Sequence, residues 1–178
     1  ITDSQFGAAR IKNINVSNLH HLLEAGIIPV VCGFQGVTED NQKFTTLGRG
    51  GSDTTAAALG AALHAEFVEI YTDVDGIMTA DPRVVAQANI LEKISYAEVC
   101  QMAHNGAKVI HPRAVEIAMS SNVPLIVKST FSEAPGTLIT NERSAGALGS
   151  DVAISDNMAS GVASLSDLAQ FRITLNPE

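Results

Sequence analysis

The sequence Thr46-Leu-Gly-Arg-Gly-Gly-Ser-Asp-Thr-Thr-Ala56 joins a glycine-rich loop to an alanine-rich segment that continues to Ala65. Glycine has no Cβ, so such a loop can adopt positive φ angles and approach a ligand closely. The alanines have high helix propensity and Ser52 and Asp53 are good N-cap residues, which predicts a helix directly after the loop. The N-terminus of a helix presents free N–H groups and the positive end of its dipole, an arrangement that favours an anion.

Arg49, inside this loop, strengthens the prediction of a site for an anionic small molecule. Its planar guanidinium can bind a carboxylate or a phosphate through two hydrogen bonds. Asp53 would repel that anion unless it interacts with a lysine, a metal ion or a proton. The spacing matches neither Gly-x-x-x-x-Gly-Lys-Ser/Thr nor Gly-x-Gly-x-x-Gly. For this stretch alone, the alternative is an ordinary loop in which Arg49 is solvated and Asp53 only caps the helix.

The composition indicates a globular domain and disfavours several classes of partner. The 178 residues are 46% hydrophobic and 4% aromatic, as in the aliphatic interior of an α/β protein. The net charge of −8 argues against nucleic acid and anionic membranes as partners, and no apolar run is long enough to span a membrane. Cys32 and Cys100 are expected to be buried free thiols of a reducing compartment. The start at Ile1, without an initiator methionine or signal peptide, suggests a chain entered part-way through.

Strand and helix signals follow one another along the chain, as in α/β folds. Apolar runs predict strands at residues 27–33, 66–72, 123–130 and 136–139. The first of these runs is continuously apolar, which is typical of a strand covered on both faces. Ser95-Tyr-Ala-Glu98 forms a capping box, and Pro112 suits the first position of a further helix. Residues 141–157 have the composition of a linker.

A second polar stretch, residues 73–83, directly follows the strand predicted at 66–72. It contains three aspartates and Arg83 within eleven residues. Open α/β sheets bind ligands beyond the carboxyl ends of their strands, so this stretch is a second candidate for the site. The alternative is a turn-rich connection, because Asp-Gly and Asp-Pro are common in turns. Lys108 taken alone would be a solvated charge, and His111 before the proline is expected to be structural.

Three linked motifs strongly resemble the aspartokinases. They are Thr-Thr-Leu-Gly-Arg-Gly-Gly-Ser-Asp-Thr-Thr (45–55), Tyr-Thr-Asp-Val-Asp-Gly-Ile-Met-Thr-Ala-Asp-Pro-Arg (71–83) and Gly-Ala-Lys-Val-Ile-His-Pro-Arg (106–113). The resemblance covers residues 1–140 and implies an α/β protein with the amino-acid kinase fold, a three-layer α/β/α sandwich. It also implies that residues 1–140 are the C-terminal portion of the catalytic domain, 141–157 a linker and 158–178 the truncated start of an ACT regulatory domain.

The resemblance further implies an activity and a set of site residues. Such proteins transfer the γ-phosphoryl group of ATP, with Mg²⁺, to the side-chain carboxylate of L-aspartate, the entry to lysine, threonine and methionine synthesis. By this match Asp53 and Lys108 are catalytic, Asp53 organising the surrounding cations and Lys108 stabilising charge and contacting the nucleotide. The implied aspartate-binding residues are Arg49, Gly50, Gly51 and Ser52. The implied ATP-binding residues are Thr72, Asp73, Met78, Arg83, Lys108 and Val109. No metal ligand from the protein is expected.

Two departures from the family pattern matter. The Lys-Phe/Tyr-Gly-Gly phosphate-binding loop of the family does not occur in this sequence, nor do the N-terminal threonine and glutamate that help bind aspartate. Met78 stands where many members have tyrosine. We therefore expect the 178-residue polypeptide to be inactive by itself. Two other functions stay open: another amino-acid kinase such as glutamate 5-kinase, and a non-catalytic regulatory chain that pairs with a catalytic subunit.

The resemblance also implies partners. Besides L-aspartate and ATP, a feedback effector (lysine or threonine) is expected at the ACT region, and a homodimer or hetero-oligomer is expected for the full-length protein. Neither nucleic acid nor a membrane is an expected partner. A cytoplasmic location, in a bacterium rather than a plastid, is expected because the sequence shows no transit segment.

Overall fold

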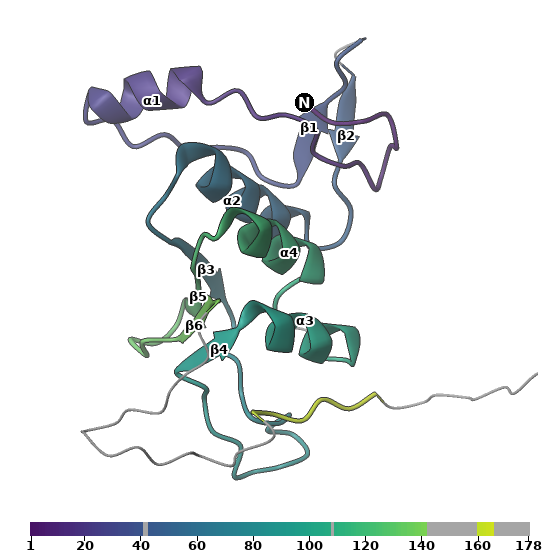
Figure 1. Ribbon diagram of the computed structural model, residues 1–178, viewed down its shortest axis with the longest axis vertical. Helices are drawn as coiled ribbons and strands as arrows, with labels where there is room; N and C mark the ends of the chain where they lie inside the picture. The colour runs from purple at the N-terminus through teal and green to yellow at the C-terminus, as the bar shows by residue number, and fades with distance from the viewer. Residues whose placement is uncertain (41–42, 108, 142–159, 166–178) are drawn as a thin grey trace, which may run out of the picture.

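The computed structural model describes residues 1–40, 43–107, 109–141 and 160–165 of the chain (Figure 1). Its helices are α1 (Ser17–Glu24), α2 (Gly51–Leu63), α3 (Tyr96–His104) and α4 (Pro112–Ser121). Its strands are β1 (Gln35–Val37), β2 (Phe44–Thr46), β3 (Val68–Thr72), β4 (Lys93–Ser95), β5 (Leu125–Ser129) and β6 (Thr137–Thr140). The alternation of strands and helices confirms the predicted α/β class.

The main sheet has the strand order β3-β5-β6-β4. Strands β3 and β5 are parallel, as are β4 and β6, whereas β5 and β6 are antiparallel. The parallel pairing of β3 with β5 places the carboxyl ends of both strands at one edge of the sheet, with Thr72 opposite Ser129. A separate antiparallel hairpin, β1-β2, leads into the glycine loop.

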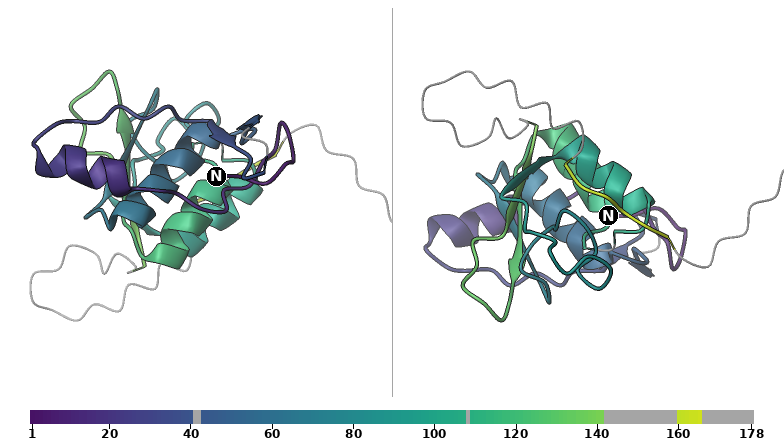
Figure 2. Two further views of the ribbon diagram at one scale, coloured as in Figure 1. Left: turned by 90° about the horizontal axis from the view of Figure 1, so that it is seen from above. Right: turned by 90° about the horizontal axis from the view of Figure 1, so that it is seen from below.

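The core lies between one face of the main sheet and helices α2, α3 and α4. Alternate residues of β5 are buried, since Leu125 and Val127 face the helices while Lys128 is on the other face. Small residues bring the first of these helices close to the sheet: a Cβ at Gly60 of α2 would lie 2.2 Å from a methyl carbon of Val68. Figure 2 shows α2, α3 and α4 on one side of the sheet and α1 on the other. Helix α1 has no buried residue.

The helix signals predicted at Ser95 and at Pro112 are confirmed. Ser95 is the N-cap of α3 and accepts a hydrogen bond from the N–H of Glu98, whose side chain in turn accepts from the N–H of Ser95. Pro112 occupies the first turn of α4, preceded by His111 as N-cap. Because Pro112 has no N–H, it loses no helical hydrogen bond at this position.

The strand predicted at residues 27–33 is wrong, because that segment has no regular secondary structure. Ile28 is 87% exposed and Val30 96% exposed. A strand covered on both faces needs neighbouring strands and a layer on each side, and the described residues supply neither to this segment. The prediction of two buried cysteines fails at the same place: Cys32 is exposed, whereas Cys100 is half-buried, and both are free thiols.

Residues 160–165 lie against the main domain. The N–H of Val162 donates to the carbonyl oxygen of Thr79 at 2.8 Å, and Ser160 Oγ donates to Glu98 Oε1 at 2.6 Å. The boundaries expected at 141–157 and 158–178 fall mostly on residues outside those that the structure describes. The longest helix of the described ranges, α2, has 13 residues, fewer than the about 20 of a helix that spans a bilayer.

Candidate active site

The glycine loop leaves β2 and enters α2 through residues with positive φ. Gly48 has a φ of 77° and Gly50 a φ of 67°, a left-handed conformation that glycine adopts at little cost. Gly50 is the N-cap of α2 and no side chain caps this helix, so the N-cap role predicted for Ser52 and Asp53 is wrong. Both residues lie instead in the first turn, where Asp53 complements the positive end of the helix dipole.

Two of the first backbone N–H groups of α2 are free to bind a ligand. The N–H groups of Gly51 and Thr54 donate to the carbonyl oxygens of Gly48 and Gly50. Those of Ser52 and Asp53 have no acceptor among the described residues. Unsatisfied N–H groups of a first turn, at the positive end of the dipole, are suited to bind an oxyanion.

Arg49 supplies a cation next to these N–H groups. Its side chain is exposed and makes no hydrogen bond or ion pair within the described ranges. A guanidinium without a carboxylate partner has its N–H donors available for an anionic ligand. The prediction that this loop and helix could bind an anion is therefore consistent with the geometry.

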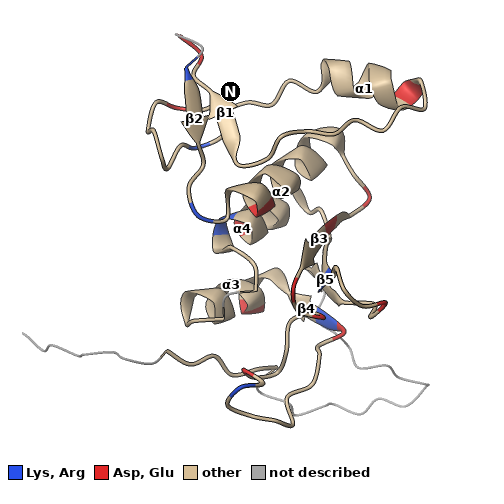
Figure 3. Ribbon diagram, turned by 180° about the vertical axis from the view of Figure 1, so that it is seen from behind, with Lys and Arg blue, Asp and Glu red and all other residues tan. Residues whose placement is uncertain are grey.

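The third motif packs against the first, although they are far apart in the sequence. The N–H of His111 donates to Asp53 Oδ2 at 3.4 Å, and His111 Nδ1 accepts from the N–H of Arg113 at 3.3 Å. The imidazole ring lies so close to Gly50 that a Cβ there would be 2.3 Å from His111 Cγ. The expectation of a structural His111 is confirmed, since it caps α4 and packs against the loop. Figure 3 shows the acidic first turn of α2 beside the basic start of α4.

The second motif begins at the carboxyl end of β3. Thr72 is the last residue of that strand, and its Oγ1 donates to Asp73 Oδ1 at 3.2 Å. Asp75 accepts a hydrogen bond from Ser132 Oγ at 2.5 Å, which ties the loop to the turn after β5. Asp73 is exposed at the sheet edge where open α/β sheets bind ligands.

Arg83 is held by Asp81 rather than being free. Its Nη2 donates to Asp81 Oδ2 at 2.7 Å and its Nε to Asp81 Oδ1 at 3.0 Å, on the protein surface. The Arg83 guanidinium lowers the pKa of the Asp81 carboxyl below its ordinary value, and Asp81 in turn raises the pKa of Arg83. A phosphate that binds Arg83 would have to compete with this carboxylate.

The other residues predicted to bind ATP differ in how accessible they are. Met78 is half-buried and forms an antiparallel bridge with Ile90. The side chain of Val109 packs against the hydrophobic core, which leaves its backbone as the part that could contact a ligand. Lys108, predicted to be catalytic, lies outside the described residues.

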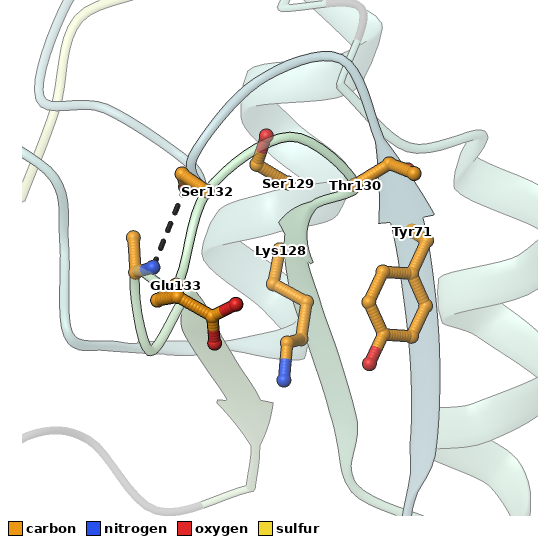
Figure 4. A pocket seen from close by; sticks show the side chains of 7 residues that line it. Tyr71, Lys128, Ser129, Thr130, Ser132 and Glu133 are labelled. Carbon is orange, nitrogen blue, oxygen red and sulfur yellow. Dashed lines mark hydrogen bonds between the residues drawn. The ribbon is translucent and has the colours of Figure 1, made fainter.

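Sequence reasoning missed a pocket beside the carboxyl ends of β3 and β5 (Figure 4). This pocket of about 170 Å³ is lined by Tyr71, Lys128, Ser129, Thr130, Ser132, Glu133 and Ala134. Lys128 Nζ lies 3.1 Å from Glu69 Oε1 and 5.3 Å from the centroid of the Tyr71 ring. This pairing lowers the pKa of Glu69 and raises that of Lys128. Only the strand register, which pairs Tyr71 with Lys128, reveals this cluster.

The structure thus joins the first and third motifs and leaves the second apart. The glycine loop touches the start of α4, whereas the loop at 73–83 lies at the other end of the helical layer (Figure 1). Within the described ranges, no group of three or more His, Cys, Asp or Glu residues could hold a metal ion.

A glycine loop at a helix N-terminus and a polar loop beyond a parallel strand are both features that α/β domains use to bind small anionic molecules. Residues 1–129 match the model of the Amino acid kinase family. The chain belongs to the amino acid kinase family.

Individual relatives in this family agree with that assignment. The chain is 49% identical over 173 residues to Aspartokinase 1 of Bacillus subtilis (strain 168), covering 97% of this chain and 42% of that relative. The crystal structure of E. coli aspartokinase III in complex with aspartate and ADP (R-state) superimposes with a TM-score of 0.69 at 41% identity, covering 80% of this chain and 33% of that chain. The same enzyme in complex with lysine and aspartate (T-state) gives a TM-score of 0.66 at 40% identity, covering 81% and 33%. The chain therefore spans less than half the length of these proteins.

Proposed function

We propose that this chain is part of an aspartokinase, which transfers the γ-phosphoryl group of ATP to the side-chain carboxylate of L-aspartate. The observation that carries this proposal is the unpaired Arg49 beside the free N–H groups of Ser52 and Asp53. This arrangement suits a ligand with carboxylates. The relatives support the choice of ligand, since E. coli aspartokinase III has been solved in complex with aspartate and ADP.

The chemistry requires charge neutralisation more than acid–base catalysis. An oxygen of the aspartate side chain forms a bond to the γ-phosphorus while the bond from that phosphorus to the leaving oxygen of ADP breaks, giving 4-phospho-L-aspartate and ADP. The attacking carboxylate has no proton to lose, so no general base is needed. Bringing two anions together is the main barrier, and fixed donors and cations lower it.

In this proposal the glycine loop holds the amino acid. Arg49 binds a carboxylate of aspartate, and the N–H groups at the start of α2 contribute further hydrogen bonds. Gly50 and Gly51 allow close approach because they have no side chains. Asp53 does not act as a base; it is positioned by its hydrogen bond from His111 and orients the surrounding cationic groups.

The nucleotide side of the site is formed by the residues after β3 and by the segment before α4. Thr72 and Asp73, at the sheet edge, are suited to contact the ribose or phosphates, and Arg83 would exchange its bond with Asp81 for a phosphate. Lys108 and the backbone of Val109 complete this set in our proposal. In this proposal the Mg²⁺ ion is held mainly by phosphate oxygens and water, as is usual for this ion at nucleotide sites. The ion would supply positive charge at the transferring group.

An enzyme assay on the protein expressed from its complete reading frame tests this proposal. Coupled measurement of ADP release should show turnover that depends on L-aspartate and exceeds the turnover with L-glutamate. Arg49→Met should raise the KM for aspartate, whereas Arg83→Met should raise the KM for ATP. Turnover with glutamate alone would favour a glutamate 5-kinase, and the absence of any acceptor-dependent turnover would favour a non-catalytic regulatory chain.

We further propose that the 178-residue polypeptide has no turnover by itself, because its sequence contains no Lys-Phe/Tyr-Gly-Gly phosphate-binding loop. Isothermal titration of Mg-ATP and, separately, L-aspartate into this polypeptide would show whether either ligand binds without turnover. A Lys108→Ala variant is the control for the nucleotide, since its ATP affinity should be lower. Aspartate-dependent ADP release by the polypeptide alone would contradict the proposal.

Regulation and assembly belong to the same proposal. E. coli aspartokinase III has been solved with lysine in its T-state, which supports lysine as one candidate effector and leaves threonine as the other. We place the effector site in an ACT region that begins near residue 158, after a linker at 141–157. A cytoplasmic location and a homodimer or hetero-oligomer complete the proposal.

A further inference from the structure

Arg113 connects the start of α4 to the glycine loop. Its Nη1 donates to the carbonyl oxygen of Leu47 at 3.1 Å and to that of Ala9 at 3.4 Å. Leu47 and Ala9 are buried, and they lie 66 and 104 residues away from Arg113 in the sequence. One guanidinium nitrogen therefore ties three distant segments together directly behind the loop.

The segment that contains Ala9 also supports the loop. A Cβ at Gly48 would lie 2.8 Å from the carbonyl oxygen of Gly7, so these two backbones are in direct contact. On its other side the loop is fixed by the N–H of Leu47, which donates to the carbonyl oxygen of Phe34 at 2.9 Å. Arg113 thus joins the backbone at Ala9 and the backbone at Leu47 to the start of α4.

The position of Arg113 at the start of α4 is electrostatically unfavourable by itself. It lies in the first turn of α4, which contains no acidic residue. A cation near a helix N-terminus is repelled by the positive end of the dipole. Hydrogen bonds from a charged donor to two carbonyl oxygens offset that repulsion.

We propose that Arg113 is a positioning residue that fixes the glycine loop in its ligand-binding geometry. Its Nη1 bonds to backbone carbonyls rather than facing the site, so it acts on the ligand through the loop, which carries Arg49 and leads to the free N–H groups of α2. The consequence for L-aspartate rests on the function proposed above, whereas the effect on the loop itself does not. The planar guanidinium holds a fixed direction that a lysine ammonium does not, so lysine should only partly replace it.

The test compares Arg113→Met and Arg113→Lys with the wild-type protein, expressed from the complete reading frame. Arg10→Met is the matched control, because Arg10 is an exposed arginine next to Ala9 whose side chain makes no hydrogen bond within the described ranges. Arg113→Met should raise the KM for aspartate on the order of 10-fold, since small misplacements of binding groups have large effects, and leave the KM for ATP unchanged. Arg113→Lys should give an intermediate value, and Arg10→Met should match the wild type.

Hydrogen exchange of the backbone amides supplies a readout that needs no substrate. In Arg113→Met the amides of Leu47 and Gly51 should exchange faster, while those of β5 in the core should keep their protection. Unchanged exchange in the loop together with an unchanged KM for aspartate would overturn the proposal. So would a lower kcat with both KM values unchanged, because that result indicates only a smaller folded fraction. If the wild-type protein has no aspartate-dependent activity, the proposed function fails and hydrogen exchange alone decides the role of Arg113.

Discussion

At the scale of single residues, the site depends on positions where only glycine fits. Gly50 combines a left-handed φ of 67° with direct packing against the ring of His111. These are separate constraints, because the first concerns the backbone and the second concerns space. The loop can therefore reach α4 closely enough for the N–H of His111 to donate to Asp53.

Gly50→Ala should destabilise the protein by more than the about 1–2 kcal/mol that a left-handed alanine costs, because its Cβ would also displace His111. Gly7→Ala is the control, since Gly7 has a φ of 91° but nothing within 4 Å of an added Cβ. Urea unfolding of both variants measures the difference. Equal losses of stability in Gly50→Ala and Gly7→Ala would show that the close contact with His111 adds no further cost.

At the scale of elements, the first turn of α3 is anchored to the segment that leads into β5. Tyr96 is buried, and its hydroxyl donates to the carbonyl oxygen of Val123 at 2.7 Å. Tyr96→Phe should cost about 1–3 kcal/mol, because it leaves this buried carbonyl without its donor. Chemical denaturation at neutral pH measures the loss.

The hydrogen bond from Tyr96 to Val123 also predicts that the stability of the protein depends on pH. Burial raises the pKa of Tyr96 in the folded protein, so the unfolded chain loses its phenolic proton first as the pH rises. The stabilisation is fully present below the ordinary tyrosine pKa of about 10 and is lost as the pH rises through the higher folded pKa. The stability difference between the wild type and Tyr96→Phe should therefore shrink above about pH 10. A constant difference across that range would contradict the assignment.

At the scale of the whole molecule, the apolar residues divide into a packed core and an exposed run. Leu125 is fully buried between the sheet and the helices, whereas Val30 is 96% exposed. Leu125→Ala should cost about 2–5 kcal/mol through lost burial and a cavity. Val30→Ala should change the stability of the 178-residue polypeptide by less than about 0.5 kcal/mol. Thermal unfolding of the two variants is the measurement, and a large effect at Val30 would show that residues 27–33 pack in solution.

Local chemistry along the chain was sufficient to predict several elements and the candidate anion site. The capping box at Ser95 and the proline at the start of α4 depend only on neighbouring residues, so both predictions are confirmed. The loop around Arg49 was predicted from residue types alone, because glycine freedom and a guanidinium are properties of the residues themselves. The run at 27–33 was predicted wrongly because strand formation needs partners that no local pattern specifies.

Tertiary structure determined which distant residues act together. The contact of His111 with Asp53 joins positions 58 residues apart, and the contacts of Arg113 span greater distances. The register of β3 against β5 likewise places Tyr71 beside Lys128. These pairings result from the crossing of helices and the alignment of strands, which are set by packing of the whole core. Residue types therefore specify the chemistry that the site can offer, and the fold specifies which of those groups meet.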